Sequence, residues 1–171
     1  PGGSSARAEL PLRDGDDSDL RSLQFCAYNG NKRSIALDLG DRDDQALFLR
    51  MVAGADMVYE SGVQGPLGTA GIDRAALEAA NPTLVHVQIT PFGLDGPRAD
   101  DPESEITLAA LGGPANLQGV RERPPVKASS PQVWRHTGAE AAVAGLVAHS
   151  RMRTAGGFRH VDVSAQSAMT W

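Results

Sequence analysis

Carboxylate side chains and one histidine are the residues of this sequence whose positions suit chemistry best. Glu105 lies in a segment that follows a Pro91-Phe92-Gly93 turn, close to Glu103. A carboxylate held beside a substrate can act as a nucleophile or as a general base. His136 stands just before a strongly helical segment, where a helix dipole stabilises anions and developing negative charge. We therefore take Glu105 and His136 as catalytic candidates, although a solvated carboxylate or a plain surface histidine would fit the same positions.

The other histidines and the single cysteine suggest structural roles. His86 and His160 fall within expected strands and His149 within an expected helix, so we expect ordinary packing or surface positions for them. Cys26 has no partner for an internal disulfide and fits a reducing compartment. The sequence holds no His-Glu-x-x-His, Cys-x-x-Cys, EF-hand or Gly-x-Ser-x-Gly pattern. We therefore expect neither a metal centre nor a serine nucleophile.

Gly62, Gly65 and Gly68 recur at regular spacing after an expected strand. A loop of this kind can bring backbone N–H groups close to a phosphate. The spacing matches neither the Walker A loop nor the dinucleotide fingerprint. The pattern alone therefore favours a plain connecting loop, with phosphate binding as the alternative.

Hydrophobic periodicity predicts strands and helices that alternate along the chain. Strands are expected at 34–39, 57–60, 85–90 and 160–163, helices at 41–53, 73–80, 103–111 and 138–153, and loops at 61–68, 91–102 and 114–133. The expected buried stripe of the last helix is Ala139, Ala142, Val143, Leu146 and Val147. This alternation predicts an α/β fold, with a parallel sheet flanked by helices.

Length and charge narrow the class of protein. With 171 residues the chain can bury one domain core. Its net charge of −5 disfavours a nucleic-acid or anionic-membrane surface as partner. No apolar run reaches the roughly 18 residues of a membrane helix, and no signal peptide is recognisable, so a cytoplasmic location is expected. Residues 1–22 are expected to form an irregular lead-in segment, and both chain ends suggest a fragment of a larger protein.

An ordered series of short motifs carries a family resemblance. The motifs are Asn31-Lys32-Arg33-Ser34-Ile35, Ala53-Gly54-Ala55-Asp56, Asn81-Pro82, Phe92-Gly93, Asp95-Gly96-Pro97 and Gly156-Gly157-Phe158-Arg159-His160-Val161-Asp162-Val163-Ser164. In this order they resemble the family III CoA-transferases of the CaiB/BaiF type, which also include formyl-CoA transferase and α-methylacyl-CoA racemase. The resemblance covers nearly all of residues 1–171. It implies part of a Rossmann-like large CoA-binding domain, without its first strand and helix and without the C-terminal small domain, from a dimer of interlocked chains.

The resemblance also implies a reaction. In these transferases an aspartate attacks an acyl-CoA, and the released CoA thiolate then splits the mixed anhydride to leave an enzyme–CoA thioester. A second carboxylic acid finally takes the CoA, so CoA is a substrate and no permanently bound cofactor is implied. An ungapped count back from Gly156 places Trp134 where the aspartate stands, and tryptophan cannot form this thioester. Residues 129–136 contain no acid at all.

Positions that contact CoA in the family also differ here. The loop in which relatives use an Asn-Phe pair reads Ser61-Gly62, and an arginine further along reads Thr69. The histidine that the racemase branch pairs with its aspartate corresponds to Ser104, which Glu105 follows. The resemblance thus implies Ser61, Gly62, Thr69 and Ser104 as candidate CoA-binding positions, and it disfavours racemase chemistry.

Three interpretations remain open. The chain can be an active transferase that uses another carboxylate, with Glu105 the best candidate. It can be a subunit, or one half of a tandem protein, that lacks the nucleophile and works with a paralogous partner that supplies it. It can bind acyl-CoA, with racemase-like chemistry or none. The expected partners are an acyl-CoA, a carboxylic acid, and a second chain in an interlocked homodimer or a heteromer.

Overall fold

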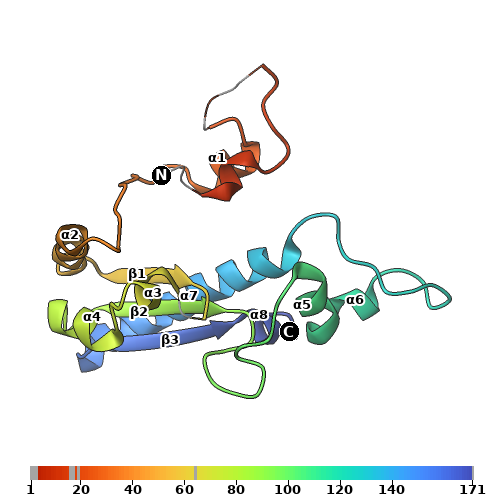
Figure 1. The fold of residues 1–171 in the computed structure, drawn as a ribbon. Coiled ribbons are helices and arrows are strands. Elements are labelled where there is room, and N and C mark those ends of the chain that lie inside the picture. Colours follow the sequence, from red (N-terminus) through yellow and green to blue (C-terminus); the bar gives the residue numbers. More distant parts are fainter. Residues whose placement is uncertain (1–3, 16–17, 19, 64, 171) are drawn as a thin grey trace. The chain divides into compact units, whose positions relative to one another are not determined.

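A computed structural model describes residues 4–15, 18, 20–63 and 65–170. The chain divides into two compact units, Pro1–Asp38 and Leu39–Trp171 (Figure 1). The first unit holds the 3-10 helix η1 (Ser5–Ala8) and the helix α1 (Leu23–Tyr28). One isolated antiparallel bridge joins Leu12 and Ser22, and the Ser22 hydroxyl caps α1 by accepting from the Phe25 N–H. The expected lead-in segment 1–22 therefore contains one short helix and one bridge in its described part.

The strand expected at 34–39 is not formed, so this prediction is wrong. None of residues 32–38 is in a helix or strand, and Ile35 leaves 53% of its surface exposed. Alternating apolar residues determine which side chains share a face, but a strand also needs a neighbour that completes its hydrogen bonds. None of the described strands pairs with this segment.

The second unit is built on a three-stranded parallel sheet in the order β1-β2-β3. Its strands are β1 (Met57–Ser61), β2 (Val85–Thr90) and β3 (Arg159–Ser164). Val58, His86 and His160 lie side by side in register across the sheet. The parallel α/β fold predicted from the alternating pattern is therefore confirmed.

Helices cover both faces of this sheet (Figure 1). On one face Val85, Val87 and Val163 pack against the long helix α7 (Gln132–Ala155). On the other face Val58 belongs to a cluster built around α2 (Arg42–Val52), α3 (Gly65–Thr69) and α4 (Arg74–Ala80). A third cluster joins α7 to α5 (Glu105–Gly112), α6 (Pro114–Leu117) and α8 (Ala165–Ala168).

Side-chain caps explain where most of these helices begin. Asp41 caps α2 by accepting from the Asp43 and Asp44 N–H groups, and Asp73 caps α4 by accepting from the Ala76 N–H. Ser104 caps α5 in the same manner. Such caps satisfy backbone donors that have no partner inside the helix. The helices expected at 41–53, 73–80 and 103–111 are confirmed within two residues at each end.

Two expected loops contain helices, so these predictions are wrong. Residues 65–69 form α3, because Gly65 reverses the chain with φ +58° and the following residues can then coil. In the expected loop 114–133, α6 begins at Pro114, a residue that suits a first helical turn. Helix α7 begins at Gln132, six residues before the expected start at Gly138.

The buried side of α7 also differs from the expected stripe. The residues that it buries are Val133, Thr137, Ala141, Gly145, Ala148 and Met152. Gly145 faces the sheet, where Tyr59 and Val87 lie close to it. A larger side chain at this position would collide with them, so only glycine fits. Val143 and Leu146, which the pattern had placed in the core, are 57% and 63% exposed. The helix is apolar on two opposite sides, and hydropathy alone does not say which one meets the sheet.

Candidate functional site

Several of the candidate residues lie toward one edge of the sheet. Ser61 ends β1, and the segment after β2 leads to Ser104 and Glu105 at the start of α5. Helix α7 joins the beginning of β3 through a short turn at 156–158, so its other end, with Trp134 and His136, points toward the carboxyl ends of the strands. Ligands of open parallel α/β sheets bind at this edge. The fold therefore brings Ser61, Glu105 and Trp134 toward the same edge of the sheet.

Glu105 is tied to the first turn of α7. Its Oε1 accepts a hydrogen bond of 2.9 Å from the Val133 backbone N–H, while its Oε2 is buried and has no hydrogen-bond partner. Pro131 stands at the N-cap position of α7, and its side chain makes no capping hydrogen bond. Glu105 thus supplies a cap from a different helix, and one carboxylate oxygen is occupied by this structural contact.

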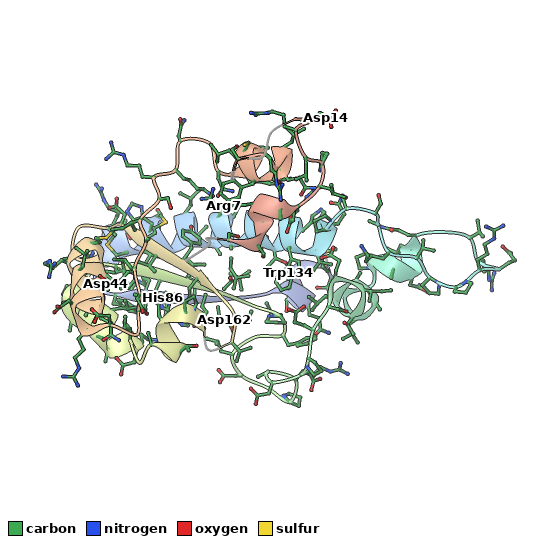
Figure 2. The ribbon with its side chains drawn as sticks, turned by 45° about the horizontal axis from the view of Figure 1, so that its top comes forward. Arg7, Asp14, Asp44, His86, Trp134 and Asp162 are labelled. Atoms are coloured by element: carbon green, nitrogen blue, oxygen red, sulfur yellow. The ribbon has the colours of Figure 1, made fainter. Side chains whose placement is uncertain are left out.

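Trp134 and His136 lie on different sides of α7. The indole of Trp134 (Figure 2) is half-buried and packs against the buried cluster that joins α5, α6, α7 and α8, which includes Leu108 and Ala165. His136 is exposed, and its Nδ1 is 2.8 Å from the Gln132 carbonyl oxygen, one turn earlier in the same helix. Trp134 therefore contributes to hydrophobic packing, whereas the ring of His136 is exposed to solvent.

The proposed CoA-contact positions lie on three elements. Gly62 adopts φ +107°, and its N–H donates to the Ile89 carbonyl, so the chain turns away from β1 at this point. Ser61 is exposed beside it. Thr69 ends α3, where its hydroxyl donates to the Gly65 carbonyl. Ser104 has its hydroxyl engaged in capping α5. These positions present small polar groups rather than large cation or aromatic contacts.

A buried polar cluster on the sheet was not predicted from the sequence. Glu60 and His86 are only 7% and 5% exposed in their side chains, and Glu60 Oε1 is 2.8 Å from His86 Nε2. The ring of His86 lies against that of His160, with centroids 5.0 Å apart. Of the two positions expected for His86, surface or packing, the structure has the buried one, with Glu60 as its partner. A usable signal was present, because both faces of a parallel sheet are covered and polar residues that alternate along its middle strand must find partners.

His160 is electrostatically unusual within this cluster. Burial, with smaller contributions from the neighbouring Arg74 and His86, lowers the pKa of His160 from 6.5 to about 4. A cavity of about 450 Å³ opens beside the cluster, and its lining includes Glu60, His86, His160, Gln88, Asp73 and Arg74. The lowered pKa therefore keeps the imidazole of His160, which lines this cavity, neutral at pH 7.

Asp162 fixes the segment that follows β2. Its Oδ1 accepts from the Thr90 hydroxyl at 2.9 Å and its Oδ2 from the Leu94 N–H at 2.7 Å. The Thr90 hydroxyl oxygen in turn accepts from the Gly93 N–H. Asp162 and His86 stand on neighbouring strands of the sheet (Figure 2). This network holds the turn that leads toward α5.

The first unit contains a separate basic groove of about 500 Å³. Its lining includes three cationic side chains and no carboxylate; the residues are Ser4, Arg7, Leu20, Phe25, Asn29, Lys32, Arg33, Ser34 and Ile35. The Arg7 guanidinium lies 4.3 Å from the centre of the Phe25 ring, and Lys32 Nζ donates to Asn29 Oδ1 at 2.9 Å. Cations, hydroxyls and an aromatic ring together suit a phosphorylated ligand with a planar base.

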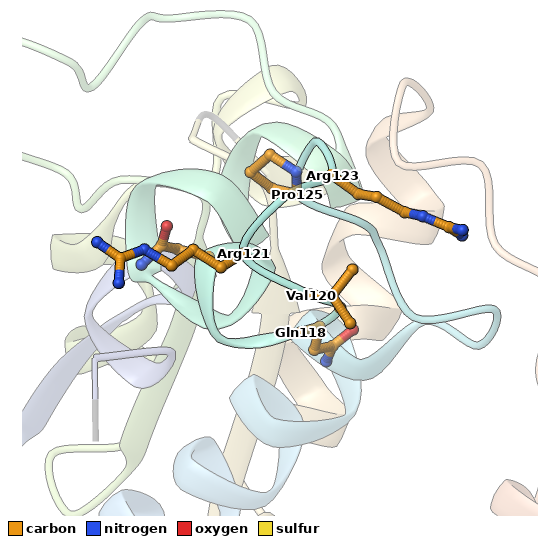
Figure 3. Close-up of a pocket in the computed structure, with 7 residues that line it drawn as sticks. Gln118, Val120, Arg121, Arg123 and Pro125 are labelled. Atoms are coloured by element: carbon orange, nitrogen blue, oxygen red, sulfur yellow. The ribbon is translucent and has the colours of Figure 1, made fainter.

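A third cavity, of about 460 Å³, lies within the segment after α6 and is lined by residues including Arg121, Arg123 and Pro125 (Figure 3). Arg121 and Arg123 extend to opposite sides of this segment (Figure 3). They therefore do not converge on one anion, and this cavity is not a clamp for a phosphate.

Two further searches give negative results for the described part of the chain. No three His, Cys, Asp or Glu side chains there are grouped so that they could hold a metal ion. None of the helices there is both long and apolar enough to cross a membrane.

The second unit belongs to the class of parallel α/β domains, in which ligands commonly bind at the carboxyl edge of the strands. Comparison with known proteins shows the family. The model of CoA-transferase family III matches residues 1–171. The chain belongs to this family, so the resemblance carried by its motifs is confirmed.

Characterised relatives have several substrates. The chain is 33% identical over 168 residues to the succinyl-CoA:(R)-benzylsuccinate CoA-transferase subunit BbsE of Thauera aromatica, covering 98% of this chain and 41% of that protein. It is 32% identical over 171 residues to the formyl-CoA:oxalate CoA-transferase of Streptomyces avermitilis, covering 99% and 40%. The crystal structure of a CaiB/BaiF family protein from Brucella suis superposes with a TM-score of 0.88 at 31% identity, covering 99% of this chain and 45% of that one. The chain thus spans less than half the length of these relatives.

Proposed function

We propose that this chain is the CoA-binding part of a family III CoA-transferase and does not itself carry the nucleophile. The whole enzyme would move CoA from an acyl-CoA to a carboxylic acid, with CoA as a substrate. Membership of the family supports the reaction class. The observation that supports the missing nucleophile is that Glu105, the carboxylate that the sequence favoured, already accepts a hydrogen bond from the Val133 N–H through one of its oxygens.

The basic groove of the first unit is the proposed contact for CoA. Arg7, Lys32 and Arg33 would neutralise phosphate groups, since guanidinium and ammonium groups form strong charge-assisted bonds with phosphate. Phe25 and Ile35 offer an apolar surface beside them. In the second unit, the proposed CoA-contact positions are Ser61, Gly62, Thr69 and Ser104, whose small side chains would let a ligand come close to the backbone.

Trp134 would close the position at which the family aspartate acts. Its indole packs into the cluster between α5, α7 and α8 and offers no group that can form a thioester. The aspartate would then come from a paralogous chain or from a second half of the same protein. Similarity to a protein that is itself named as a subunit supports this arrangement. We further propose that the chains associate as an interlocked dimer or heteromer in the cytoplasm.

Two alternative functions predict different CoA adducts from the proposed one. If Glu105 is a displaced nucleophile, the protein alone forms a covalent CoA adduct on Glu105, and Glu105→Gln abolishes it. If the protein only binds acyl-CoA, no adduct forms on it or on any partner, although acyl-CoA binds reversibly. Our proposal predicts reversible binding by this chain and an adduct on a co-purified or co-expressed partner. Incubation with a panel of acyl-CoAs followed by peptide mass mapping separates the three results.

A further inference from the structure

The chain between the end of β1 and the end of α3 carries the proposed CoA-contact positions Ser61, Gly62 and Thr69. We name residues 61–63 and 65–69 the contact segment. Ser61 and Thr69 are exposed and can be reached by a ligand. Whether they meet CoA correctly depends on how the backbone of the contact segment is held.

Gln88, on the middle strand of the sheet, holds the first part of the contact segment. Its Nε2 donates to the Gly62 carbonyl oxygen at 3.1 Å and to the Val63 carbonyl oxygen at 3.0 Å. The Gly62 N–H donates in turn to the Ile89 carbonyl oxygen at 2.9 Å. Gln88 is only 7% exposed, so both donors of its amide meet their partners away from water. This amide therefore fixes the backbone immediately after β1.

Glu60 and His86 hold the second part of the contact segment, at the start of α3. A carboxylate oxygen accepts hydrogen bonds, so His86 Nε2 donates to Glu60 Oε1, at 2.8 Å. The other oxygen, Oε2, accepts from the Leu67 N–H at 3.4 Å. The carboxylate also lies so close to Gly65 that a Cβ atom there would collide with it. His86 therefore orients the Glu60 carboxylate, and the carboxylate meets the first turn of α3.

These polar side chains lie on the face of the sheet opposite α7. His86 and Gln88 alternate along β2 with Val85 and Val87, which pack on the α7 side. Glu60 is in register with Gln88 on the neighbouring strand. Strands covered on both faces normally carry apolar residues, because a buried polar group without a partner is costly. Here the hydrogen bonds of Gln88 and Glu60 lead out of the sheet to the contact segment.

We propose that Gln88, Glu60 and His86 are positioning residues that hold the contact segment in the conformation that binds CoA. The inference rests on the proposed function, in which this segment contacts CoA, and adds the residues that prepare it. The cavity of about 450 Å³ beside the segment, which Val63 and Gly68 help to line, leaves room for the segment to shift. Without the hydrogen bonds only a fraction of the molecules would have the binding conformation, and the apparent dissociation constant would rise by the inverse of that fraction.

Calorimetric titration of the full-length protein with CoA tests the Gln88 contact. Gln88→Met keeps the length of the side chain and removes both donors, so it should raise the dissociation constant for CoA by about tenfold. Val163→Ala is the control, because it truncates a buried side chain on the α7 side of the same sheet. The control should lower the free energy of unfolding but leave the dissociation constant within about twofold of the wild-type value. Wild-type affinity in Gln88→Met would overturn the inference, and so would an equal loss of affinity in the control.

Two substitutions of His86 separate its hydrogen bond from its bulk. His86→Gln can still donate to Glu60 through its amide, whereas His86→Phe keeps a ring and has no donor. His86→Phe should weaken CoA binding by about tenfold, and His86→Gln should stay within about threefold of wild type. A role in packing alone predicts the reverse order, because phenylalanine fills the space of the imidazole better. The reverse order, or equal affinities in the two variants, would contradict the inference, and Gln88→Met decides if His86→Phe does not fold.

Ser61→Trp keeps this inference separate from the proposed function. Ser61 is exposed, and its side chain takes no part in the hydrogen bonds described above, so a large side chain there obstructs CoA directly. If the wild type does not bind CoA, or if Ser61→Trp binds it as well as the wild type does, the proposed contact fails and the inference fails with it. If Ser61→Trp weakens binding and Gln88→Met does not, the proposed contact stands and the inference alone is overturned.

Discussion

The Glu105 side chain accepts a hydrogen bond from the Val133 backbone N–H, although the two residues are 28 positions apart in sequence. This contact joins the start of α5 to the start of α7. It gives Glu105, the carboxylate that the sequence favoured as a nucleophile, a structural role beside Trp134, the residue that we propose in place of the family's aspartate. Substitution of Glu105 can therefore separate its structural contact with Val133 from any catalytic role.

Glu105→Gln and Glu105→Ala should differ in stability. The amide oxygen of glutamine can still accept from the Val133 N–H, so Glu105→Gln should cost less than about 1 kcal/mol. Alanine removes the cap and should cost about 1–2 kcal/mol. Urea unfolding followed by circular dichroism measures both free energies of unfolding. An equal loss in the two variants would show that the cap does not stabilise α7.

Gly145→Ala should destabilise the domain because the new methyl group would collide with the Tyr59 hydroxyl and approach Val87. Overpacking of this kind costs about 1–3 kcal/mol. Gly138→Ala is the matched control, since it lies in the same helix with no atom near the added carbon, and it should stabilise α7 by about 0.5–1 kcal/mol. Thermal unfolding compares the two. Adding Tyr59→Phe should recover part of the loss at Gly145, and no recovery would mean that the hydroxyl is not the obstacle.

His160 should make stability depend on pH. Its pKa of about 4 in the folded chain is below the ordinary 6.5, so between these values the unfolded state binds more protons. The free energy of unfolding should therefore be highest above about pH 6.5 and fall as the pH decreases toward about 4. Denaturant titrations across this range measure the slope, and His160→Gln should flatten it. A slope that is unchanged in His160→Gln would assign the pH dependence to other groups.

Lys32→Ala and Arg33→Ala should weaken CoA binding, because both cations line the basic groove. Loss of one charge-assisted contact should raise the dissociation constant by about tenfold, and added salt should reduce the difference between wild type and variants. Calorimetric titration with CoA measures both effects. Arg50→Ala removes the same charge from α2 and serves as the control. Equal weakening in the control would mean that net charge, and not the groove, attracts CoA.

Local signals in the sequence were sufficient for much of the fold. Asp41 and Asp73 cap the helices that they were expected to begin, because a cap depends only on the next few residues. The strand Val85–Thr90 and the Val161–Val163 region likewise followed from short alternating patterns. The family assignment depended on an ordered set of motifs rather than on any single one.

Contacts between distant residues explain what the sequence did not predict. The start of α7 at Gln132 depends on Glu105, which belongs to another helix, so no signal near 132 marks it. The contact between Glu60 and His86 joins two strands, and becomes visible only when their register is known. The orientation of α7 depends on the space that Tyr59 and Val87 leave for Gly145. Hydropathy could not choose between two apolar sides of one helix.

The central claim is that this chain binds CoA but does not carry the nucleophile, and one measurement tests it most directly. The purified protein is incubated with a panel of acyl-CoAs, alone and with any co-purifying partner, and CoA-sized mass additions are mapped to peptides. The account predicts no adduct on the carboxylates of residues 1–171 and an adduct on the partner or on a second half of the protein. An adduct on Glu105 would contradict it, and would make this chain a transferase with a displaced nucleophile.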